Sequence, residues 1–148
     1  MAISDQQRAE KSAAAMWATD DASKWFGMEL EAVGPGTATM SLTVQQCQTN
    51  GHDICHGGVI FALADSAFAF ACNSRNAVTV AQTNSITYVA PGRAGDRLTA
   101  DAEEVARSGR SGTWDVTVTN QDGTIIALFR GLARTIGGAL FEEEQQEA

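Results

Sequence analysis

The chain has 148 residues, which is enough for one domain with a substantial core. Apolar residues make up 44% of it and charged residues 19%, a globular composition that excludes an intrinsically disordered protein. The net charge of -8 argues against a nucleic-acid partner, because phosphate binding needs a surface rich in lysine and arginine.

The N-terminal part is predicted to be helical over residues 1–25, with the helix itself at residues 4–24. It lacks the apolar core of a secretory signal, and three cysteines fit reduced thiols, so we expect a cytoplasmic protein. The helix either packs on a sheet or covers a ligand site. Two strands follow at residues 26–33 and 37–44, joined by a Gly-Pro-Gly turn and showing apolar and polar residues in alternation.

Residues 59–72 read VIFALADSAFAFAC and contain neither glycine nor proline. This pattern predicts a helix of about four turns that is apolar on every side and therefore buried. It is too short to span a bilayer, and it carries Asp65 in its middle. An unpaired buried carboxylate is strongly unfavourable or takes up a proton. We interpret Asp65 as a functional residue; the alternative is a structural aspartate bonded to the backbone or to a hydroxyl.

The remaining chain alternates strands with turns, and four further strands are predicted at residues 77–90, 96–107, 113–120 and 124–135. No repeat or linker divides residues 1–148, so we expect a single domain that ends in an acidic, solvated tail at residues 139–148. An antiparallel sheet needs an apolar layer on one face, and the helix is the obvious one. These elements predict an α+β hotdog fold, an antiparallel sheet wrapped around one long buried helix. Strand 77–90 is expected to pair with its copy across a two-fold axis.

Gly57 and Gly58 stand at the start of this helix, where backbone N–H groups lack partners and carry partial positive charge. Glycine lets a ligand approach closely, so the turn is a candidate oxyanion hole; the alternative is a plain turn into the helix. Asp65 lies about 12 Å further along the helix axis and cannot serve its own Gly57. In a two-fold dimer it could meet Gly57 of the partner subunit.

The residues around the glycines leave alternatives open. His56 is a base or a structural histidine, and Asn50 holds a water or a carbonyl or only forms a turn. Ser66 bonds back to its helix or touches the substrate. A zinc site is not predicted, because Cys47, His52, Cys55 and His56 lack the spacing of a zinc site. The adjacent pair Cys55-His56 is also poorly arranged for nucleophilic catalysis.

The glycine-rich turn Ser108-Gly109-Arg110-Ser111 is either an ordinary hairpin or a grip on a phosphate through Arg110 and backbone N–H groups. Arg93, which follows Pro91-Gly92, could add positive charge there.

The string NGHDICHGG at residues 50–58, followed by ADSAFAFACNS at residues 64–74, resembles the hotdog-fold acyl-CoA thioesterases of phenylacetate degradation. The resemblance continues through Pro91-Gly92, ALFRG at residues 127–131 and IGG at residues 136–138, nearly the whole chain. It implies hydrolysis of an aryl-acyl-CoA, such as phenylacetyl-CoA or a hydroxylated phenylacetyl-CoA, without metal or organic cofactor. Members of that family form dimers paired into tetramers, with CoA at subunit boundaries.

Matched by motif, the resemblance makes Asp65 the nucleophile or general base, Gly57 the donor to the thioester carbonyl and Asn50 a positioning residue. His56, Gly58 and Ser66 become substrate contacts, although the family commonly has threonine where this chain has Ser66. Two alternatives are an acyl-thioester hydratase or dehydratase, which pairs a histidine with a carboxylate, and a non-catalytic acyl-CoA-binding domain.

Overall fold

A computed structural model of the protein describes residues 2–144. The elements follow one another as α1 (Asp5–Trp17), α2 (Asp21–Trp25), β1 (Glu29–Gly34), β2 (Thr37–Thr43), the 3-10 turn η1 (Gln46–Gln48), α3 (Gly57–Cys72), β3 (Thr79–Tyr88), β4 (Arg97–Ser108), β5 (Ser111–Thr119) and β6 (Ile125–Thr135). No helix among residues 2–144 is long and apolar enough to cross a membrane.

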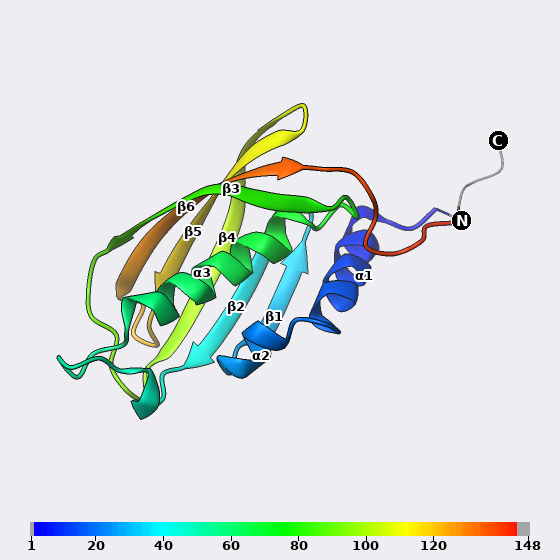
Figure 1. Cartoon of the computed structure of the whole chain (residues 1–148). Helices are drawn as coiled ribbons and strands as arrows, with labels where there is room; N and C mark the ends of the chain where they lie inside the picture. Colours follow the sequence, from blue (N-terminus) through cyan, green and yellow to red (C-terminus); the bar gives the residue numbers. More distant parts are fainter. Residues whose placement is uncertain (1, 145–148) are drawn as a thin grey trace.

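The strands form one six-stranded sheet in the order β1-β2-β4-β5-β6-β3, and every neighbouring pair is antiparallel. Helix α3 lies across one face of this sheet, while α1 and α2 lie near the β1 edge (Figure 1). This arrangement confirms the predicted hotdog fold. It also places β3 at an edge, so one side of that strand has no neighbouring strand among residues 2–144.

The core lies between α3 and the sheet. Phe68 of α3 is 1% exposed and stacks edge-on against Trp114, with ring centroids 6.0 Å apart. Gly131 of β6 sits directly below it, and a Cβ at that position would come within 2.6 Å of the Phe68 ring. The close approach of α3 to the centre of the sheet therefore depends on a glycine in β6.

The N-terminal segment differs from the prediction of one helix over residues 4–24. Helix α1 ends at Trp17, and a second helix starts after Asp20. The Asp20 carboxylate accepts hydrogen bonds from the backbone N–H of Ser23 at 2.9 Å and from its hydroxyl at 2.7 Å. This N-cap favours a new helix over continuation of the old one. The strand predicted from residue 26 accordingly begins only at Glu29, since Phe26 is the C-cap of α2.

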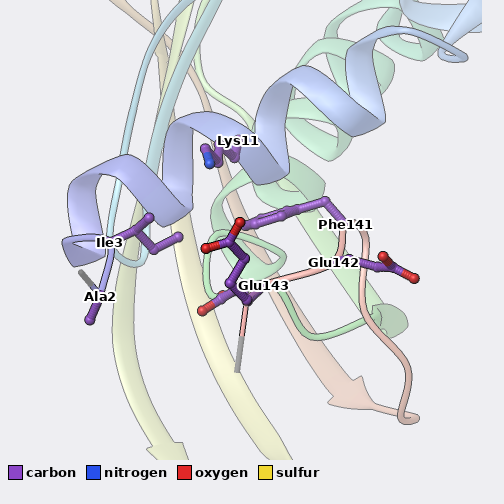
Figure 2. Close-up of a pocket in the computed structure, with 7 residues that line it drawn as sticks. Ala2, Ile3, Lys11, Phe141, Glu142 and Glu143 are labelled. Carbon is purple, nitrogen blue, oxygen red and sulfur yellow. The ribbon is translucent and has the colours of Figure 1, made fainter. Parts of the chain in front are cut away.

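The acidic tail also differs from the prediction as far as residue 144; residues 145–148 lie outside the described part. Glu143 accepts two hydrogen bonds from the Arg8 guanidinium, at 2.7 and 3.2 Å. Lys11 of α1 lies over the Phe141 ring, 5.8 Å from its centroid (Figure 2). Asn76, with φ +57°, accepts the backbone N–H groups of residues 140 and 141. The segment is thus docked on α1 through Glu143 and Phe141 and is not simply solvated there. Glu142 and Glu144 are exposed.

Candidate active site

The start of α3 is capped by His56, whose Nδ1 accepts the Gly58 N–H at 2.8 Å. The predicted substrate contacts His56 and Gly58 are therefore already bonded to each other through these atoms. The N–H of Gly57 donates to no group among the described residues. Of the two glycines, Gly57 is the one that retains a free donor at the positive end of the helix.

Tyr88, at the end of β3, was not predicted from the sequence to belong to the site, yet it holds the Gly57 peptide group through the carbonyl oxygen. Its hydroxyl donates to the Gly57 carbonyl oxygen at 2.8 Å. A Cβ on Gly57 would come within 3.0 Å of the Tyr88 ring and hydroxyl. Only glycine fits here without displacing the tyrosine.

A cavity of about 510 Å³ lies in front of the helix start, and its lining is mostly apolar: Asn50, Ile54, Cys55, Gly57, Ile60, Tyr88, Val89, Ala90, Pro91 and Gly92. The motif loop is fastened to the loop after β3, because the Cys55 N–H donates to the Gly92 carbonyl oxygen at 2.7 Å. The structure therefore brings Asn50 and Gly57 together, although they are separated in sequence by a turn.

The two polar atoms of the Asn50 side-chain amide are used differently. Its Oδ1 accepts the His52 N–H at 2.9 Å, which builds the turn anticipated from Asn-Gly. Its Nδ2 makes no hydrogen bond to the described residues, and Asn50 is one of the residues that line the cavity.

Asp65 lies in the middle of α3 and is only half-buried in the single chain. Its Oδ1 accepts a hydrogen bond from Nδ2 of Asn84, a β3 residue, at 2.9 Å. Burial raises the pKa of Asp65 above the ordinary aspartate value, and the Asn84 hydrogen bond opposes that rise. Asp65 does not line the Gly57 cavity, so one chain does not bring the two predicted catalytic residues together.

Ser66 points elsewhere. Its hydroxyl lies 2.9 Å from the hydroxyl of Ser23, which in turn donates to the Asp20 carboxylate. Since the Ser23 hydroxyl uses its one hydrogen in the bond to Asp20, the Ser66 hydroxyl is the donor in this pair. The Ser66 hydroxyl therefore joins α3 to α2, and no contact among the described residues directs it at a substrate.

The residues predicted to hold CoA lie in two places. Arg93 is exposed next to the motif cavity, and its backbone N–H donates to Asp96 at 2.8 Å. The turn Ser108–Ser111 is a hairpin at the other end of α3, where it lines a cleft with Cys72. That cleft is also lined by Arg75, Arg107 and Arg110.

Cys55 is buried, which raises its thiol pKa to about 11 and keeps it protonated near neutral pH. A thiolate nucleophile at Cys55-His56 is therefore disfavoured. Within residues 2–144, no three His, Cys, Asp or Glu side chains gather in a way that could hold a metal ion.

The comparison with known proteins identifies relatives along most of the chain. The sequence is 40% identical to the acyl-coenzyme A thioesterase PaaI of Escherichia coli K12, over 92% of this chain and 97% of that protein. The structure of the E. coli PaaI protein, from the phenylacetic acid degradation operon, matches with a TM-score of 0.90 over 92% of this chain and 99% of that one.

Two further solved structures extend the comparison. The phenylacetic acid degradation protein PaaI of Thermus thermophilus is 36% identical, with a TM-score of 0.74 over 77% of this chain and 97% of that one. A Streptococcus mutans protein bound to acetyl-CoA is 27% identical, with a TM-score of 0.73 over 76% and 90% of the two chains. The family model of the thioesterase superfamily matches residues 52–127, from the motif loop to β6. With that match and the 40% identity to the E. coli protein, the chain belongs to the thioesterase superfamily.

Proposed function

We propose that this protein hydrolyses aryl-acyl-CoA thioesters, with phenylacetyl-CoA or a hydroxylated phenylacetyl-CoA as substrate, to the free acid and CoA. The observation that carries the proposal is Asp65, a half-buried carboxylate on an otherwise apolar helix, in a chain 40% identical to an acyl-CoA thioesterase. Perturbed carboxylates of this kind are typical of catalytic sites.

The active site is composite in this proposal. In the single chain, Phe61, Ala62, Asp65, Ser66 and Ala69 form a strip of α3 that is only half-buried. Asp65 of this strip bonds to Asn84 of β3, and the outer edge of β3 has no neighbouring strand in the described chain. A second copy paired along β3 would cover the strip with an antiparallel α3. Gly57 of the partner subunit would then lie opposite Asp65, so the protein would act as a homodimer.

A homotetramer is supported by the other face of the sheet. Leu128 and Leu132 of β6 are 47% and 42% exposed there, and Val80 of β3 is 42% exposed. Exposed apolar groups on one sheet face favour packing against a second dimer.

In the proposed reaction, the thioester carbonyl oxygen accepts the free N–H of Gly57 of the partner subunit, which stabilises the negative charge that develops on that oxygen. Asp65 either attacks the carbonyl carbon or removes a proton from the attacking water. The carbon–sulfur bond breaks, CoA leaves as the thiol, and one water is consumed. The apolar cavity beside Tyr88 suits an aryl group, and Asn50, which lines the same cavity, would supply a hydrogen-bond donor through its amide.

The test is hydrolysis of phenylacetyl-, hydroxyphenylacetyl-, benzoyl- and straight-chain acyl-CoA, followed by release of free thiol. A hydratase or a binding domain would release none. We expect Asp65→Asn and Asp65→Ala to lower kcat by at least about 100-fold while the oligomer stays folded. Asp101→Asn, at an exposed carboxylate of β4, is the matched control and should be active. Near-normal hydrolysis by both Asp65 variants would refute the assignment.

A further inference from the structure

Asn84 is half-satisfied in a way that an ordinary structural asparagine is not. Its Nδ2 donates to Asp65 at 2.9 Å, but its Oδ1 is enclosed and accepts no hydrogen bond from the described residues. Asn73, at the end of α3, provides the contrast. Its Nδ2 donates to the carbonyl oxygens of Ala69 and Thr79, and its Oδ1 accepts the Thr79 N–H at 2.9 Å.

The orientation of the Asn84 amide follows from the charge of its neighbour. Turning the amide over would place Oδ1 against the Asp65 carboxylate, and two acceptors would then face each other. The observed orientation leaves an enclosed oxygen without a donor, which is unfavourable for folding. The only hydrogen bond this side chain makes among the described residues is the one to Asp65. Its arrangement therefore serves Asp65 and not the stability of β3.

We propose that Asn84 is the positioning residue of Asp65. Its amide holds Oδ1 of the Asp65 carboxylate against β3 and leaves Oδ2 of the same carboxylate turned to the reacting groups. The inference rests on the proposed function of Asp65. Oδ2 accepts no hydrogen bond from the described residues, and unlike Oδ1 of Asn84 it is not enclosed, so solvent reaches it in the single chain. With one oxygen fixed, the other has a defined direction for water or for the thioester carbon.

The same contact also affects the charge of Asp65, and no basic group among the described residues contributes to that effect. Burial raises the Asp65 pKa, and the Asn84 N–H is the one group that lowers it. The other titratable groups near Asp65 are Cys72, about two turns further along α3, and Asp20 of the α2 cap, which is linked to Asp65's neighbour Ser66 through Ser23. Neither can supply a positive charge. Removing the Asn84 donor should therefore raise the Asp65 pKa further.

The experiment compares Asn84→Leu and Asn84→Asp with the unmodified protein. The Asp65 carboxyl carbon is titrated by NMR in the full oligomer and assigned by its absence in Asp65→Asn, and kcat/KM is measured against pH. For Asn84→Leu we expect both midpoints about one pH unit higher, and higher still for Asn84→Asp, where two carboxylates would share a proton. Activity lost at neutral pH should recover as the pH rises, since Asp65 acts as the carboxylate.

Two control variants separate this role from a structural one. Gln82→Leu removes an exposed amide from the same strand and should leave the Asp65 titration unchanged. Asn73→Leu breaks a satisfied network and should lower Tm, whereas Asn84→Leu should not. An Asp65 titration in Asn84→Leu that coincides with the unmodified protein, or a loss of Tm equal to that of Asn73→Leu, would overturn the proposal. Absence of hydrolysis by the unmodified protein would refute the proposed function alone, because the NMR titration does not depend on turnover.

Discussion

Gly57 combines two properties: its N–H is free of partners among the described residues at the start of α3, and a Cβ at this position would lie within 3.0 Å of the Tyr88 ring. The tyrosine hydroxyl on the Gly57 carbonyl oxygen fixes the orientation of this peptide group. An oxyanion hole depends on such orientation, because its donor must already point at the oxygen when charge develops.

We expect Gly57→Ala to lower kcat by about 100-fold, because the new Cβ would lie 3.0 Å from the Tyr88 ring and push the peptide group out of position. The double variant Gly57→Ala, Tyr88→Ala relieves the contact and should regain part of kcat. Gly51→Ala, where a Cβ meets nothing within 4 Å, is the matched control and should retain activity. An active Gly57→Ala enzyme with an unmoved Tyr88 would show that the contact is unimportant.

Asp65 and Gly57 could be singled out from the sequence because each breaks a local pattern, a charge in an apolar helix and a glycine at its start. Tyr88 and Asn84 could not. They lie 31 and 19 residues away from their partners along the chain, and only the position of β3 brings them into contact. The bond between Ser66 and Ser23 was missed for the same reason, because it links α3 to a helix 43 residues earlier.

The position of the β4–β5 hairpin in the fold determines where its arginine side chains can bind an anion. It lies at the C-terminal end of α3, about 10 Å along the axis beyond Asp65, whereas the chain's own Gly57 is about 22 Å from that end. Arg75 and Arg107 share Glu104 as their acidic partner. Arg110 makes no ion pair among the described residues, so its guanidinium is available to an anion in the cleft at this end of α3.

We expect Arg110→Ala to raise KM for an acyl-CoA several-fold with little change in kcat, because a phosphate contact binds the substrate and its transition state alike. The KM difference should shrink at high salt, which screens exposed charges. Arg97→Ala is the control, since that guanidinium already bonds Glu29 and Glu31 at 2.8 and 3.0 Å. An unchanged KM for Arg110→Ala would remove the hairpin from the CoA site.

At the level of elements, the sequence was informative wherever turns were marked by glycine or proline. The β-strands after α3 were therefore predicted to within a few residues. The break between α1 and α2 was missed, because the cap at Asp20 competes with residues that would also continue a helix. The docking of Glu143 on Arg8 joins residues 135 positions apart, a contact that composition cannot predict.

The whole molecule raises the question of which subunit completes each site. The half-buried strip on α3 and the edge of β3, which has no neighbouring strand among the described residues, are the two surfaces that the proposed dimer would cover. If Asp65 of one subunit works with Gly57 of the other, an Asp65 variant on one subunit and a Gly57 variant on its partner fall in the same site, and the second site of that dimer stays intact.

We therefore predict complementation between two inactive proteins. When Asp65→Asn and Gly57→Ala subunits are co-expressed in equal amounts, random pairing gives about half mixed dimers, each with one intact site and one doubly defective site. The preparation should then regain about a quarter of the unmodified kcat per subunit. Co-expression of two differently tagged Asp65→Asn chains is the control and should stay inactive. If the mixed preparation has no more activity than its parents, each site is built from a single chain, and α3 must bring its own glycine turn and carboxylate together by a rearrangement that this structure does not contain.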